Sequence, residues 1–168
     1  LIAKNYAFKM GKGVLHVRKA VLNIQADAKT KTFGDVNPNL TYTVTGFKNG
    51  ETIDNSGLNG QPDLSTPATV NSNVGTYSIN VSKGNLNCKN YLFVFNNGTL
   101  EVTKAKLSVI AQDQSRIYGE SNPDFTATYN GFKRGDTWAT SGIQGQPALN
   151  STATISSPAG NYEITVAK

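Results

Sequence analysis

The sequence predicts a mainly β protein of two tandem small domains, each with at most one short helix, arranged as an elongated rod. The first observation is an internal repeat: residues 1–83 align with residues 86–168 without a gap, and about 36 of the 83 pairs are identical. The second is an alternation of apolar and polar residues with a period of two, which is typical of half-buried strands. The third is the spacing of Gly, Asn and Pro between those segments, which marks turns. A period of 85 residues exceeds the roughly 20–50 residues of a solenoid coil, so each copy should be a domain of its own.

Composition narrows the class of protein. The chain has 168 residues, of which 38% are hydrophobic, and no apolar run approaches the roughly 18 residues of a membrane span. Its net charge of +5 comes from singly spread Lys and Arg with no interleaved aromatic row, which argues against nucleic acid as a partner. Cys88 is the only cysteine, so no disulfide framework can form. We therefore expect neither nucleic-acid binding nor insertion of this fragment into a membrane.

A period of two is seen in four segments between residues 40 and 102, and the first two of these rows recur one period later, between residues 125 and 166. Each row predicts a strand with apolar side chains in the core and hydroxyl side chains in solvent. Between the copies Tyr42 is replaced by the smaller Ala127, while Val44 is replaced by the larger Tyr129. This exchange on one face roughly conserves volume, as a packed core requires. The predicted core rows are Leu40, Tyr42 and Val44; Tyr77, Ile79 and Val81; Tyr91, Phe93 and Phe95; Leu100 and Val102; Phe125, Ala127 and Tyr129; and Tyr162, Ile164 and Val166.

Turn residues separate these rows. Asn96-Asn97-Gly98 predicts a β-hairpin, because Asn and Gly tolerate positive φ at both central positions. Residues 34–38, with an Asp, an Asn and a Pro, predict a tight connection. Residues 50–57 and 135–142 each have room for one or two helical turns that end at a glycine. No other stretch has helical spacing.

A change in the alternation places the domain boundary. Leu100 and Val102 point inward at even numbers, whereas Leu107 and Val109 point inward at odd numbers. One strand facing one core cannot change parity without a bulge, but two cores joined by a continuing strand explain the change. We therefore interpret residues 21–105 as the complete first repeat, residues 1–20 (the N-terminal segment) as the last hairpin of a preceding repeat, and residues 106–168 as a second repeat that lacks its own last hairpin.

On this interpretation the second repeat lacks five core side chains. At roughly 1.5–3 kcal/mol for each buried side chain, the loss is on the order of 10 kcal/mol. Because a domain has only about 5–15 kcal/mol of net stability, the second repeat should not hold alone. Two alternatives remain open. Either a neighbouring molecule donates its residues 1–20 head to tail, or the true units are permuted and span residues 1–84 and 85–168.

Several of these segments resemble a known family. Residues 31–38, 40–47 and 49–52, the stretch at 74–77 and the ending at 90–100 are similar to the YGX type of MBG repeat (mucin-binding, β-grasp-like). Tyr118-Gly119 matches the Tyr-Gly of that name, where the first copy has Phe33-Gly34. The resemblance covers essentially the whole chain. It implies a β-grasp-like α+β sheet with little helix, and large repetitive proteins of the bacterial cell surface, or secreted proteins, that are often adhesin-like.

Candidate chemistry is sparse. His16 is the only histidine, and Glu101 stands at its position in the other copy, so we expect a solvated strand residue, no catalytic residues and no enzyme activity. Asp35 with Asn37, and Glu120 with Asn122, offer one carboxylate per turn, whereas a calcium site needs about 6–8 oxygens. We therefore expect no metal and no cofactor.

The differences between the copies point to one candidate binding site. Trp138 replaces Ile53, and Arg134 replaces Asn49 beside Lys133 and Asp136. An aromatic ring flanked by Arg and Asp can stack on a sugar and bind its hydroxyls. The alternative is that Trp138 caps the core over the short helical turn, as Ile53 would. The binding residues expected from sequence are Trp138, Lys133, Arg134 and Asp136.

Two functions follow as hypotheses. The first is a structural and adhesive module, a spacer in an extracellular multi-repeat stalk, because the linker at residues 104–106 has no Gly or Ser to loosen it. Its partners would be neighbouring repeats of the same parent chain, or another molecule through residues 1–20. The second is a carbohydrate-binding module for host or matrix glycans of the mucin type.

Overall fold

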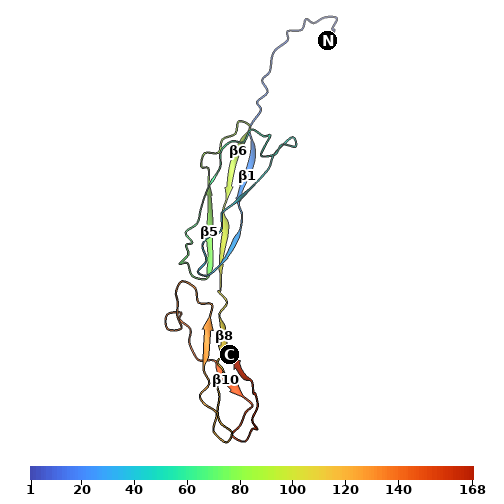
Figure 1. Ribbon diagram of the computed structural model, residues 1–168. Helices are drawn as coiled ribbons and strands as arrows, with labels where there is room; N and C mark the ends of the chain where they lie inside the picture. The colour runs from blue at the N-terminus through green and yellow to red at the C-terminus, as the bar shows by residue number, and fades with distance from the viewer.

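The computed structural model describes residues 1–168 and consists of strands and turns without a helix, so the mainly β prediction is confirmed. Figure 1 shows β1–β7 gathered in one group and β8–β11 in a second group beyond it, joined by the chain between Thr103 and Ser108. The strands are β1 (Ala20–Ala26), β2 (Lys29–Thr32), β3 (Tyr42–Thr45), β4 (Asp63–Ser65), β5 (Gly75–Ser82), β6 (Tyr91–Asn96), β7 (Gly98–Thr103), β8 (Ser108–Ala111), β9 (Ala127–Asn130), β10 (Ala148–Ser151) and β11 (Ile164–Ala167).

The first group forms two sheets that face one core. One sheet has the strand order β3-β1-β6, and the other has the order β2-β7-β5-β4. β1 runs parallel to β6 and β2 runs parallel to β7, while β3, β4 and β5 pair antiparallel with their neighbours. Residues 20–32 and 91–103 therefore lie side by side as two long parallel segments, each of which passes from one sheet to the other.

The predicted hairpin at Asn96-Asn97-Gly98 is wrong. β6 and β7 do not pair with each other, because Gln25 faces Asn96 and Lys29 faces Leu100 in the same parallel direction. Neither Asn97 nor Gly98 has the positive φ that such a turn requires. Gly98 is needed for a different reason, since a Cβ there would collide with the carbonyl oxygen of Ala26. We call residues 91–103, with β6 and β7, the closing segment of the first repeat.

The predicted core rows of the first repeat are confirmed. Ile79 and Leu100 have no exposed surface, and the polar residues on either side of each along its strand are exposed. Leu22 and Ile24, which the predicted rows did not include, are also fully buried. Apolar burial of this kind, at about 1.5–3 kcal/mol for each large side chain, is the main favourable term in folding. The cluster comprises Leu22, Ile24, Ala26, Val44, Ala68, Ile79, Val81, Leu86, Cys88, Tyr91 and Leu100, with Leu40, Tyr42, Tyr77, Phe93 and Phe95 packed against it.

The second group has no comparable core. It forms two separate two-stranded sheets, β8-β9 and β10-β11, and none of the 15 buried residues of the chain lies beyond Val102. The prediction of a core row is wrong for Tyr162 and Val166, which are 40% and 38% exposed. Their counterparts Tyr77 and Val81 lie beside the closing segment, and no segment of this chain occupies that place in the second repeat.

The N-terminal segment is extended and solvent-exposed. Residues 1–19 contain no strand, every one of them is exposed, and Figure 1 shows them running away from both groups of strands. Ile2 is 100% exposed and Leu15 is 88% exposed. Apolar side chains therefore remain in solvent at one end of the molecule, while the strands β8–β11 at the other end contain no buried residue.

The short helix allowed by the sequence reduces to one turn in each repeat. Ser56 N–H donates to the carbonyl of Thr52 at 3.1 Å, and Ser141 N–H donates to the carbonyl of Thr137 at 2.9 Å. Gly57 and Gly142 follow with φ of 72° and 73°, which ends each turn in the left-handed region. A single turn of this kind is not a stable helix by itself, because the first turn fixes the backbone of several residues in return for one hydrogen bond.

Candidate functional site

Trp138 lies on the single helical turn that follows β9. The turn is fixed by the hydroxyl of Thr140, which accepts the Thr137 N–H at 2.8 Å, and by the hydroxyl of Ser141, which donates to the Trp138 carbonyl at 3.0 Å. The indole stacks on Tyr129 with ring centroids 4.5 Å apart and a tilt of 39°. Because Trp138 is only half-buried, this pair leaves aromatic surface in contact with solvent.

Lys133 and Arg134 point toward the first repeat. Arg134 has a φ of 59°, as Asn49 has a φ of 55° in the first copy, so the chain reverses sharply after β9 in both repeats. The Lys133 Nζ lies 3.0 Å from Asp35 Oδ1, and the Arg134 guanidinium carbon lies 5.2 Å from the centre of the Phe33 ring. These contacts form an inter-repeat junction, which we define as Phe33, Gly34 and Asp35 of the first repeat with Lys133 and Arg134 of the second.

The junction is tightly packed but modest in energy. A Cβ at Gly34 would lie 2.5 Å from the Lys133 Cβ, so only glycine fits against this side chain. The Lys133 and Asp35 side chains are 40% and 46% exposed, and an ion pair of that exposure contributes about 0–1 kcal/mol. The contact of Arg134 with the Phe33 ring adds about 0.5–1 kcal/mol. Steric fit and two weak contacts together favour one orientation of the repeats.

Asp136 does not join the Trp138 surface. Its N–H donates to the Lys133 carbonyl at 2.9 Å, which closes the turn, and its carboxylate makes no hydrogen bond. The equivalent Glu51 accepts a hydrogen bond from the hydroxyl of Tyr91 in the closing segment, which raises the pKa of Tyr91 above its ordinary value of 10.0. The structure thus brings Lys133 and Arg134 together at the junction and leaves Trp138 and Asp136 outside it.

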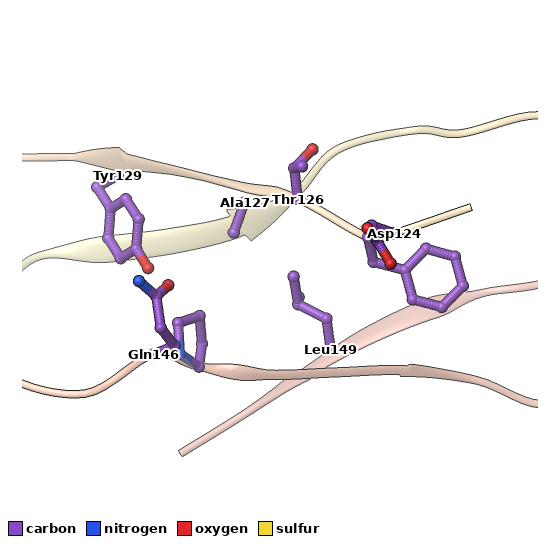
Figure 2. A pocket seen from close by; sticks show the side chains of 8 residues that line it. Asp124, Thr126, Ala127, Tyr129, Gln146 and Leu149 are labelled. Atoms are coloured by element: carbon purple, nitrogen blue, oxygen red, sulfur yellow. The ribbon is translucent and has the colours of Figure 1, made fainter. Parts of the chain in front are cut away.

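The second repeat contains two cavities that are open to solvent. The first, of about 520 Å³, lies between β9 and β10, and Figure 2 shows Ala127 and Tyr129 on one side facing Gln146 and Leu149 on the other. The second, of about 750 Å³, lies between residues 111–118 and residues 157–164. In the first repeat β7 lies between β2 and β5, at the place that corresponds to the second cavity. Phe93 and Phe95 of β6 pack on the same core as Leu40 and Tyr42, at the place that corresponds to the first cavity. Both cavities therefore stand where the closing segment of the first repeat would lie.

The predicted polar turns are structural in both repeats. Asn37 donates to the carbonyl of Ala68 at 2.6 Å, and Asn122 donates to the carbonyl of Ala153 at 2.8 Å. No group of three His, Cys, Asp or Glu side chains lies close enough to hold a metal ion. His16 is exposed in the N-terminal segment and has no hydrogen-bond partner.

One structural feature near the turn at residues 34–38 was not predicted from the sequence. Lys31 is 6% exposed, and its ammonium donates to the carbonyls of Asp35 and Thr69 at 3.0 and 2.6 Å. Arg116, at the same position in the second repeat, donates to the Asn122 side chain at 2.8 Å. The signal was present, because both copies place a long cation where strand alternation points inward.

Fold and site together define a protein of tandem β repeats with an inter-repeat junction and no constellation of reactive side chains. The family model for the MBG domain (YGX type) matches residues 22–101 and again residues 107–168. The chain belongs to this family and carries two of its repeats, in agreement with the resemblance seen in the sequence. No curated protein and no solved structure matches the chain. No helix of the structure is both long enough and apolar enough to cross a membrane.

Proposed function

We propose that this chain is a spacer from the multi-repeat stalk of a bacterial cell-surface or secreted protein, in which successive repeats keep a preferred orientation along a rod. The observation that carries this proposal is the inter-repeat junction, where Arg134 covers Phe33 and Lys133 leaves no room for a Cβ at Gly34. Family membership supports it, because MBG domains occur as repeats in surface proteins. The linker between β7 and β8 supports it as well, since it has no Gly or Ser.

The proposed repeat boundaries are 21–105 and 106–168. Every buried side chain of the chain lies between residues 22 and 102, which supports a complete first repeat and an open second one. The parallel pairing of β1 with β6 in a mixed sheet supports a β-grasp-like arrangement in which the helix has shrunk to one turn. Permuted units at 1–84 and 85–168 would place the two long parallel segments in different units and so separate β1 from β6 and β2 from β7.

Backbone ¹⁵N relaxation at low protein concentration tests the spacer function. A spacer with a preferred orientation tumbles as one body, so the relaxation rates of strands β1–β7 and β8–β11 should fit one common rotational diffusion tensor. Substituting Lys133 and Arg134 by Ala should make the two groups of strands tumble with different correlation times. Independent tumbling of the repeats in the unmodified chain would contradict the proposal.

A second function, recognition of mucin-type glycans, rests on Trp138. Ile53, which holds this position in the complete first repeat, is 48% exposed, so an indole there stays accessible whether or not the repeat is completed. An exposed indole offers a flat apolar face to a sugar ring. Binding to a glycan array that is lost in Trp138→Ala and kept in the matched control Ile53→Ala would support this function. Equal binding by both variants, with both folded, would contradict it.

A further inference from the structure

The open second repeat and the exposed N-terminal segment fit each other position by position. Residues 6–18 stand one period before the closing segment at 91–103. Five of these thirteen pairs are identical, and all five are positions that face the core or abut the backbone in the closing segment. The positions that face solvent all differ. The retained residues are Tyr6, Phe8, Gly13, Leu15 and Val17.

We propose that residues 6–18 of a second copy of this chain insert into the second repeat as its closing segment, so that chains assemble head to tail. The register follows from the pairs of the first repeat. Leu22 faces Phe93 and Lys29 faces Leu100 there, so Leu107 would face Phe8 and Gln114 would face Leu15 of the incoming chain. In the first repeat β7 also pairs antiparallel with β5, where Tyr77 faces Leu100. The equivalent pair in the second repeat would place Leu15 of the incoming chain opposite Tyr162.

Each cavity receives a matching part of the insert. The cavity between residues 111–118 and 157–164 takes the place of β7 and would receive Leu15 and Val17. The cavity of Figure 2 lies beneath the equivalents of Leu40 and Tyr42, and would receive Phe8 and Met10 in the positions of Phe93 and Phe95. Tyr6 would bring its hydroxyl to Asp136, as Tyr91 brings its hydroxyl to Glu51. This contact gives Asp136 a structural reason to be acidic.

Charge favours the same occupant. Residues 1–20 hold five Lys and Arg and no Asp or Glu, while the other 148 residues hold equal numbers of each sign, so the whole net charge of +5 lies in the N-terminal segment. The two cavities are lined by the carboxylates of Asp113, Asp124 and Glu163 against the single cation Arg116. A basic strand therefore approaches an acidic groove.

The segment cannot close on its own chain. In the proposed register Arg18 lies beside Ile117, and Lys19 alone links it to Ala20, which pairs with Tyr91. Two residue steps span at most about 7 Å. Residues 20–32 run along the first repeat for about 40 Å at about 3.3 Å per residue, and Figure 1 shows the N-terminal segment leaving at the end far from β8. Within residues 1–168 the N-terminal segment cannot reach its own groove, so the proposed insert is that of a second copy, and a head-to-tail contact of this kind can add further copies at each end.

Two glycine variants separate insertion from non-specific association of the apolar segment. A Cβ at Gly98 would collide with the carbonyl oxygen of Ala26, so Gly13→Val should collide with the carbonyl oxygen of Ala111 and prevent insertion. Gly11→Val is the matched control, because Asn96 fills that position in the first repeat without strain. Neither glycine has an atom within 4 Å in the single chain, so neither variant should disturb its fold. Non-specific association, by contrast, should strengthen in both.

Light scattering after size exclusion over a wide range of protein concentrations is the test. The unmodified chain and Gly11→Val should show average masses several times 17.9 kDa that rise with concentration, and Gly13→Val should stay at 17.9 kDa. Leu15→Asp should also stay monomeric, whereas Val14→Asp should assemble, since the equivalent Leu100 is buried and Thr99 is exposed. A monomeric unmodified chain at every concentration, or assembly of Gly13→Val equal to that of the unmodified chain, would overturn the proposal.

A peptide of residues 1–20 gives a second measurement on the full Gly13→Val chain, whose groove is free. Titration should shift the backbone amide resonances of β8 and of residues 160–164 and leave those of β3 unchanged. The same peptide with Gly13→Val should cause no shift. The inference rests on the proposed repeat boundaries, and its failure is distinguishable from failure of the spacer function, because the relaxation experiment concerns the orientation of two repeats within one chain. Equal shifts from both peptides would contradict strand insertion.

Discussion

The guanidinium of Arg134 in the second repeat lies over the ring of Phe33 in the first, with 5.2 Å between the guanidinium carbon and the ring centre. The same guanidinium donates to the carbonyl of Asn71 at 3.4 Å. Asn49, which holds the equivalent position in the first repeat, is exposed and has no such contact. A residue that differs between two otherwise similar copies is therefore placed at the one surface where the copies meet. Because the contact depends on the relative position of the repeats, it is the natural target for variants.

Gly34→Ala should disturb the junction, and Gly119→Ala should not. Both glycines have positive φ, 84° and 87°, so each alanine costs about 1–2 kcal/mol of backbone strain. Only Gly34 has Lys133 against it, whereas Gly119 has open space. Chemical denaturation should show similar losses for the two variants, while relaxation of the two repeats should change for Gly34→Ala alone. A change in tumbling of equal size in both variants would speak against the junction.

Lys31→Met should destabilise the first repeat by about 1–3 kcal/mol, because two partly buried hydrogen bonds from a charged donor to backbone carbonyls would be lost. Lys31→Arg should be within about 1 kcal/mol of the unmodified chain, since Arg116 fills the same place in the second repeat. Arginine can also reach the Asn37 Oδ1, a buried acceptor without a hydrogen bond in the first repeat, as Arg116 reaches Asn122. Urea denaturation followed by Tyr fluorescence measures both effects. Unchanged stability of Lys31→Met would show that the ammonium contributes nothing.

Asp27→Asn should make the free energy of unfolding less dependent on pH in acid. The hydroxyls of Thr41 and Thr43 donate to the Asp27 carboxylate and hold its pKa below the ordinary value of 3.8. A pKa lowered on folding contributes stability that is present above the unfolded value and is lost as pH falls through the folded value. The free energy of unfolding of the unmodified chain should therefore decline below about pH 3.8 more steeply than that of the variant. Parallel curves in that range would contradict this role for Asp27.

Amide hydrogen exchange should divide the chain into two zones. The amides of Leu22 and Ile24 lie in a buried strand and should exchange only through global unfolding, whereas those of β8 and β11 should exchange through local opening. The measurement is made on Gly13→Val so that assembly does not protect the second repeat. Adding the peptide of residues 1–20 should slow exchange in β8 and leave β1 unchanged. Equal protection of β1 and β8 without the peptide would mean that the second repeat is stable alone.

The inward-facing residues could be predicted because the alternation of apolar and polar side chains is set within each strand. Strand alternation identified Leu100 and Val102 as inward residues, and both are buried. The pairing of β1 with β6 could not be predicted in the same way, since parallel partners lie 71 residues apart and the alternation of one strand does not name its neighbour. The Asn97-Gly98 pair misled for a related reason. An Asn-Gly pair favours a tight turn, but the parallel pairing of β6 with β1 and of β7 with β2 keeps residues 96–98 extended.

The candidate site shows the same limit. The replacement of Asn49 by Arg134 drew attention to this position, yet the sequence could not show that the guanidinium meets Phe33, because the packing between two domains follows no sequence period. The expected cluster of Trp138, Lys133, Arg134 and Asp136 assumed that neighbours in sequence share one surface. In the structure the turn between Arg134 and Asp136 separates the cations from Trp138, which stacks on Tyr129.

Pulsed electron spin resonance between the two repeats tests the spacer account most directly. Spin labels at Ser78→Cys and Asn130→Cys occupy exposed positions on β5 and β9, and Cys88→Ala removes the native thiol at a position that the other copy fills with Ala3. Unlabelled chain in excess keeps the measured distances within one molecule. The account predicts one narrow distance distribution that broadens when Lys133 and Arg134 are both replaced by Ala. A broad distribution in the unmodified junction, unaffected by those substitutions, would contradict it.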